Sequence, residues 1–109
     1  MTDIRATAQK ALRSLGTTPD EIADSLRLRG ITGYQRCSTK CIIANYLEVE
    51  TGEPWVVSGG AHTLNDLGIF VFLGAQVAMF IHRFDAGYYP DLETPRPVHP
   101  SPWKILVTA

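Results

Sequence analysis

Two cysteines, Cys37 and Cys41, stand four residues apart beside the basic residues Arg36 and Lys40. If this stretch is helical, both thiols project from one face, because residues four apart in a helix are neighbours. They could then act as a redox pair, with Cys37 activated by Arg36 and by the helix N-terminus, or supply half of a zinc site. The remaining zinc ligands would have to come from scattered histidines, which are His62, His82 and His99. A third interpretation is structural, with Cys41 a small core residue and Cys37 a partly exposed thiol.

A cysteine nucleophile would also need a base and an acidic residue that orients the base. The pairs His62–Asp66 and His82–Asp85 are the candidates, but no motif around either pair supports catalysis. The dipeptide Gly59-Gly60 lacks the Gly-Lys-Ser/Thr context of a phosphate-binding loop. We therefore expect a non-enzymatic protein without a cofactor.

The cysteines lie in the longest stretch of the chain that contains basic but no acidic residues. Between residues 25 and 47 the basic residues are Arg27, Arg29, Arg36 and Lys40, and acidic residues flank the stretch on both sides. An anion-facing surface should therefore lie there, or else the stretch is an ordinary solvated face.

DNA binding is one hypothesis for this stretch. Three predicted helices followed by a strand–turn–strand unit resemble, in element order alone, a winged helix-turn-helix. The third helix would then present Arg36, Ser38, Thr39, Lys40 and Asn45, residue types that contact phosphates and bases. Against this, the presumed wing at residues 58–61 has no basic residue and the net charge is −1.

Protein association is the main hypothesis. The chain is rich in Tyr and Trp, which are favoured interface anchors: Tyr34, Tyr46, Trp55, Tyr88, Tyr89 and Trp103. These aromatics could equally fill the core. We expect a binding or regulatory protein that acts through a protein partner or as a homodimer. DNA binding through residues 36–45 and a thiol- or zinc-dependent role of Cys37 and Cys41 are the alternatives.

Helices should form the first half of the chain. Apolar residues spaced by three and four predict a helix over residues 3–15, and Thr18-Pro19 with Glu21 predicts the start of a second that ends near Gly30. The short link predicts that these two pack as a hairpin. A third helix should run over about residues 38–50 with Ser38 as its cap.

Strands should follow at residues 55–58, 61–64 and 69–73, as an antiparallel meander whose last strand lies at the centre of the core. A fourth helix over residues 75–85 should dock on this sheet. Four prolines make the following stretch an extended arm, with a possible edge strand at residues 103–108. The prediction is one α+β domain, residues 1–93, followed by an arm at 94–109.

Composition agrees with one small folded domain. The chain has 109 residues, 45% of them hydrophobic and 19% charged. The N-terminus is polar, and no apolar run is long enough to cross a bilayer. We therefore expect a cytoplasmic protein with no membrane partner and reduced thiols.

Overall fold

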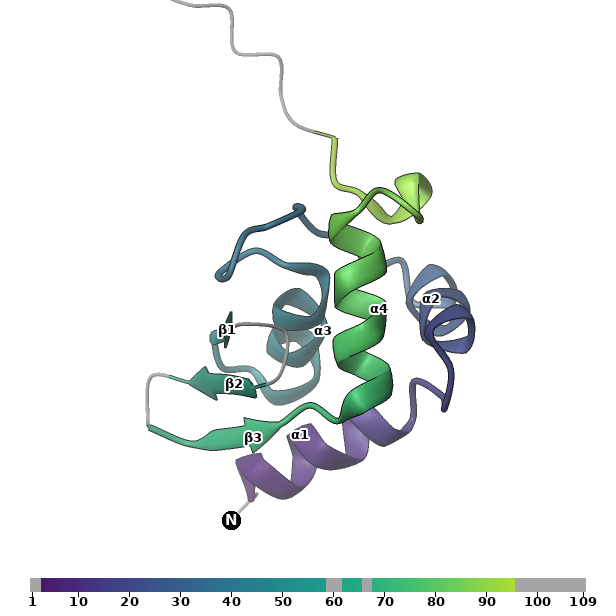
Figure 1. Ribbon diagram of the computed structural model, residues 1–109. Helices are drawn as coiled ribbons and strands as arrows, with labels where there is room; N and C mark the ends of the chain where they lie inside the picture. Colours follow the sequence, from purple (N-terminus) through teal and green to yellow (C-terminus); the bar gives the residue numbers. More distant parts are fainter. Residues whose placement is uncertain (1–2, 59–61, 66–67, 96–109) are drawn as a thin grey trace, which may run out of the picture.

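Four helices and short strands make up the computed structural model, which describes residues 3–58, 62–65 and 68–95 (Figure 1). The elements are α1 (Ile4–Arg13), α2 (Pro19–Leu28), α3 (Ile42–Thr51), β1 (Trp55–Ser58), β2 (His62–Asn65), β3 (Phe70–Phe72), α4 (Ala75–Asp85) and the 3-10 turn η1 (Pro90–Leu92). The predicted mixture of helix and strand is confirmed. The link between the first two predicted strands at residues 59–61 and the possible edge strand at 103–108 lie outside the described residues.

The first two helices begin at side-chain caps. Asp3 accepts a hydrogen bond from the backbone N–H of Ala6, and Thr18 accepts one from Glu21 at 3.2 Å. The Glu21 carboxylate in turn accepts the backbone N–H of Thr17 at 2.8 Å, and this bond holds the pKa of Glu21 below its usual range. Local sequence therefore sets both helix starts, as predicted.

The helices pair differently from the prediction. α1 packs chiefly against α3, and α2 packs against α4, so the expected hairpin of the first two helices is wrong. α4 likewise docks mainly on α2 and not on the sheet, and Figure 1 shows α2 lying beside α4. Phe80 of α4 stacks with Phe84 and with Tyr89, and the Tyr89 hydroxyl donates to the Asp20 carboxylate of α2 at 2.9 Å, which links the segment after α4 to α2.

The strands pair in the order β1-β2-β3, and both pairings are antiparallel. Trp55, Val57, Thr63 and Val71 are buried on the inner face. Trp55 also donates its indole N–H to the Thr51 hydroxyl at 2.8 Å, which joins the end of α3 to the start of β1. The inner face therefore belongs to the same core as α1 and α3.

The third helix begins later than predicted. It starts at Ile42 with Cys41 as its N-cap, so residues 38–40 form a turn and not the first helical turn. Two backbone bonds hold this turn, one from the Val57 N–H to the Ser38 carbonyl and one from the Tyr34 N–H to the Lys40 carbonyl, both at 2.9 Å. These longer-range bonds override the capping tendency of Ser38.

Gly33 lies directly against the start of α3. A Cβ at this position would come within 2.5 Å of the Ile42 Cα and 2.8 Å of the Cys41 carbonyl carbon. The Gly33 N–H donates to Leu92 at 3.1 Å, and its carbonyl accepts the Thr94 N–H at 2.9 Å. Only a residue without a side chain fits between α3 and the segment after η1.

Replacing Gly33 with alanine should therefore destabilise the protein by about 3 kcal/mol, because backbone atoms must move to admit the methyl group. The measurement is the free energy of unfolding in urea. Gly52→Ala is the matched control: Gly52 has φ 76° with open space around it, so strain there should cost only about 1 kcal/mol. Equal losses at the two positions would contradict the close approach.

Tyr46 supplies the main polar contact inside the core. Its side chain is 1% exposed, and its hydroxyl donates to the Ala11 carbonyl at 2.7 Å, which joins α3 to α1. Removing this hydroxyl as Tyr46→Phe should lower the free energy of unfolding by about 1 kcal/mol. Tyr88→Phe, at a side chain that is 68% exposed, should change it by less than about 0.5 kcal/mol. An unchanged stability for Tyr46→Phe would show that the buried bond contributes nothing.

Candidate functional site

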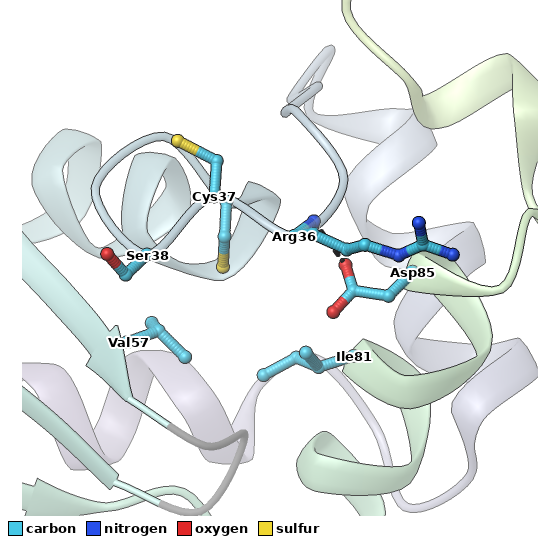
Figure 2. Close-up of a pocket in the computed structure, with 7 residues that line it drawn as sticks. Arg36, Cys37, Ser38, Val57, Ile81 and Asp85 are labelled. Carbon is cyan, nitrogen blue, oxygen red and sulfur yellow. Dashed lines mark hydrogen bonds between the residues drawn. The ribbon is translucent and has the colours of Figure 1, made fainter.

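A pocket of about 250 Å³ opens where the loop before α3 meets β1 and α4. Its lining, drawn in Figure 2, consists of Arg36, Cys37, Ser38, Cys41, Val57, Ile81 and Asp85. We call this the thiol pocket. Both cysteines line it, so the structure does bring them together, although not on one helix face as the sequence predicted.

Backbone hydrogen bonds fix the loop that carries the thiols. Arg36 adopts a left-handed backbone conformation with φ 53°, which is uncommon for a residue other than glycine. Its backbone N–H donates to the Asp85 carboxylate at 2.9 Å, which ties the loop to the end of α4 (Figure 2). The bond from Val57 to Ser38 ties the same loop to β1. The loop is therefore anchored on both sides of the pocket.

The two thiols have different environments. Cys41 is 5% exposed, and burial, together with Asp85 and Cys37 nearby, raises the pKa of its thiol, although the backbone N–H groups of Ala44 and Ile43 partly oppose this. Cys37 is half-buried, and its sulfur lies 3.7 Å from the Thr39 hydroxyl. Cys37 is thus the more accessible thiol, and Cys41 is held behind it.

The part of the chain that the structure describes forms no metal-binding cluster around the thiols. Among the described residues, no three His, Cys, Asp or Glu side chains are close enough to hold a metal ion. His82 is exposed on α4, whereas His99, Asp66 and the side chain of His62 lie outside the description. The pocket therefore offers two thiols and two charged side chains, Arg36 and Asp85.

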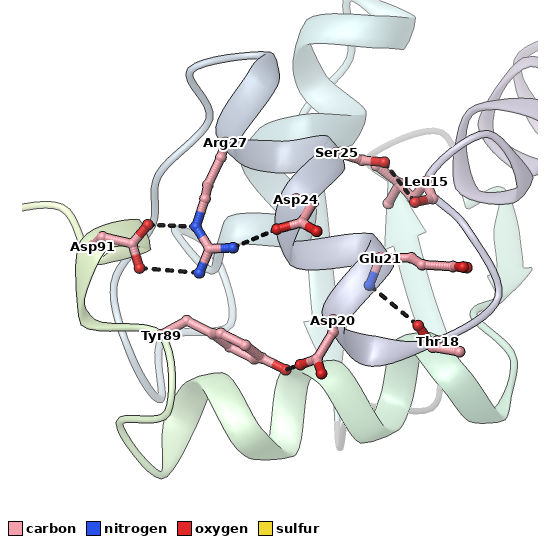
Figure 3. Close-up of polar contacts among 9 residues, drawn as sticks. All are labelled: Leu15, Thr18, Asp20, Glu21, Asp24, Ser25, Arg27, Tyr89 and Asp91. Carbon is pink, nitrogen blue, oxygen red and sulfur yellow. Dashed lines mark hydrogen bonds and ion pairs between the residues drawn. The ribbon is translucent and has the colours of Figure 1, made fainter.

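The basic residues of the second helix are engaged within the protein. Arg27 forms ion pairs with Asp24 at 2.6 Å and with Asp91 at 2.5 Å, as Figure 3 shows. It also lies 5.9 Å from the centre of the Tyr89 ring. The hydrogen bonds from Arg27 hold the pKa of Asp91 below its usual range. Arg27 thus joins α2 to η1. Because Asp24 and Asp91 balance its positive charge, Arg27 should attract an external anion only weakly.

Other predicted binding residues are also used internally. Arg29 donates to the Ser25 carbonyl at 3.1 Å and lies 5.7 Å from the Tyr46 ring centre. The Asn45 amide donates to the carbonyls of Thr32 and Lys40 at 2.8 and 3.2 Å.

Three of the four predicted binding residues on the loop and on α3 are open to solvent. Thr39, Lys40 and Arg36 are exposed on the loop. The exposed positions at the far end of α3 include Glu48 and Glu50, which would repel nucleic acid.

The outer face of the sheet is a second surface of interest. Val56, Phe70 and Phe72 are 38%, 50% and 65% exposed, and they project from β1 and β3 on the side opposite to the core. We call these three residues the sheet face. The sequence predicted that the third strand lies at the centre of the core, and this is wrong for Phe70 and Phe72, because β3 is an edge strand with only Val71 turned inward. Leu28, at the end of α2, is likewise 88% exposed.

Asp85 is a pocket residue whose contact with the loop the sequence did not predict. It was considered only as an orienting partner for His82, whereas the structure pairs it with the loop backbone. One signal was present: Asp85 is the last residue of a helix, where the dipole disfavours a carboxylate. The hydrogen bond from the Arg36 N–H offsets this unfavourable position for the carboxylate.

The different environments predict that iodoacetamide alkylates Cys37 before Cys41. The native protein should react faster at Cys37 by about tenfold or more, because Cys41 needs a local opening before it can react. Peptide mass spectrometry after timed quenching measures both rates, and unfolding in urea should make them similar. Equal rates in the native protein would contradict the burial of Cys41.

The described helices include none that is both long enough and apolar enough to cross a membrane. No protein-family model matches the sequence, and comparisons with curated proteins and with solved structures found no significant similarity.

Proposed function

We propose that this protein is a non-enzymatic association module that forms a homodimer through its sheet face. The observation that carries the proposal is the exposure of Phe70 and Phe72 side by side on β3. Large exposed aromatic side chains are uncommon on monomeric proteins and are enriched at the centre of protein interfaces.

A second copy is the partner that this surface suits best. The three described members of the sheet face are all apolar, so two copies of the face can pack on each other without charge repulsion. A two-fold axis places the same patch on both subunits, which requires a self-complementary surface. A flat apolar sheet face meets that requirement, since strands of two packed sheets interdigitate their side chains.

DNA binding through residues 36–45 has less support from the geometry. Asn45 donates to two carbonyls of its own chain, and Arg27 and Arg29 make other contacts within the protein. The acidic residues Glu48 and Glu50 lie on the same helix as Asn45.

The double variant Phe70→Thr with Phe72→Thr should dissociate the dimer. Threonine keeps the strand preference of these positions but removes the aromatic contacts, so the dissociation constant should rise at least about tenfold. Multi-angle light scattering over a concentration series measures this. Leu28→Gln is the matched control, because it removes an even more exposed apolar side chain from the end of α2.

Circular dichroism should be unchanged in both variants, since all the replaced side chains are exposed. A wild-type protein that stays monomeric up to about 0.1 mM would refute the homodimer, because a weaker dimer has no specific interface of useful size. A dimer that survives the double variant, or that Leu28→Gln disrupts, would place the interface elsewhere.

A further inference from the structure

The thiol pocket contains reactive groups that the association function does not use. The half-buried Cys37 and the buried Cys41 line one cavity, and the loop between them is only three residues long. Arg36 and Asp85 provide opposite charges at the same cavity. The Arg36 guanidinium forms no hydrogen bond or ion pair with the described residues, since only its backbone N–H contacts Asp85.

We propose that the thiol pocket is a thiol–disulfide exchange site, in which Cys37 and Cys41 react with a small disulfide that carries carboxylates, such as glutathione disulfide. The Arg36 guanidinium would bind a carboxylate of this molecule, and Asp85 an ammonium group. Amino-acid-derived disulfides carry both groups, which fits the charges of the pocket.

The accessible thiol reacts first. The Cys37 thiolate attacks one sulfur of the small disulfide, the disulfide bond breaks, and one small thiolate leaves. Cys37 then holds the other half of the molecule as a mixed disulfide. This order follows from exposure, because Cys41 is only 5% exposed and lies behind the loop.

The buried thiol resolves the intermediate. Cys41 attacks the sulfur of Cys37, the mixed disulfide breaks, and the second small thiolate leaves while the Cys41 proton passes to solvent or to the leaving group. Two protein thiols are thereby oxidised to one disulfide, and one small disulfide is reduced to two small thiols. The reaction is reversible and needs no other reactant.

The disulfide would close across a turn and not within a helix. Cys41 is the N-cap residue of α3 and has extended backbone angles, so its side chain is outside the regular helix. Residues 38–40 form a turn, which returns the chain from Cys37 toward Cys41. A pair held in successive turns of a helix would lack this freedom.

The reaction products of three proteins test the proposal. Purified reduced protein is incubated with glutathione disulfide and analysed by intact mass spectrometry after acid quenching. The wild type should lose two hydrogens and keep no glutathione, Cys41→Ala should keep one glutathione on Cys37, and Cys37→Ser should stay reduced. Cys37→Ser replaces a surface thiol and therefore provides a folded variant even if Cys41→Ala is unstable.

The charge of the small disulfide tests the role of Arg36. Arg36→Gln should slow the reaction with glutathione disulfide by about threefold, as expected for an exposed charge contact. The same variant should not slow the reaction with cystamine, which carries ammonium groups and no carboxylate. Lys40→Gln is the matched control, since it removes a neighbouring positive charge that does not line the pocket.

Three results would overturn the proposal. The first is a native wild-type protein that retains two free thiols while the urea-unfolded chain oxidises. The second is a stable mixed disulfide on wild-type Cys37 that Cys41 never resolves. The third is a Cys37→Ser variant that reacts as fast as the wild type, which would make Cys41 the attacking thiol. Equal effects of Arg36→Gln and Lys40→Gln would refute the contact between Arg36 and the carboxylate.

Discussion

The close approach of Gly33 to the first residues of α3 is the constraint on which the rest of the structure depends. The missing side chain lets the backbone lie against Cys41 and Ile42, while its N–H and carbonyl bond to Leu92 and Thr94. One residue therefore joins the loop, the central helix and the segment that follows α4. Because the chain is held at Gly33 and again at Ile42, the eight residues between them must form a loop. This loop carries the thiols, and its position follows from packing and not from local helix preference.

Local signals in the sequence predicted those elements whose ends depend on neighbouring residues. Thr18, Pro19 and Glu21 start α2 where the sequence indicated, and the fourth helix has the predicted bounds of Ala75–Asp85. The third helix was misplaced because Ser38 is a good cap by itself, and only the bonds from Val57 and Tyr34 hold residues 38–40 in a turn. Nothing in the sequence indicates that these residues form hydrogen bonds with each other. The same limit explains the wrong helix pairing, since a short link does not specify which faces meet.

The candidate site could be predicted only in part, for a related reason. The sequence indicated the right segment, because Arg36, Cys37 and Cys41 do line one pocket, but it could not supply Val57, Ile81 and Asp85 from β1 and α4. The sequence also suggested that the basic stretch forms a positive surface. In the structure, however, the charge of Arg27 is neutralised in part by Asp91, which lies 64 positions further along the chain. Phe70 and Phe72 were assigned to the core because apolar runs look alike whether a strand is central or at an edge.

β1 connects the two surfaces proposed to carry function. Successive side chains of a strand point to opposite faces, so Val57 lines the thiol pocket while Val56 belongs to the sheet face. The Val57 N–H also holds the Ser38 carbonyl, which lies in the turn between the two cysteines. A disulfide between Cys37 and Cys41 would reshape that turn and act on β1 through this bond. The packed core transmits such a change because it has little free space to absorb it. Oxidation of the two thiols and dimerisation through the sheet face, both proposed above, would then be coupled through β1.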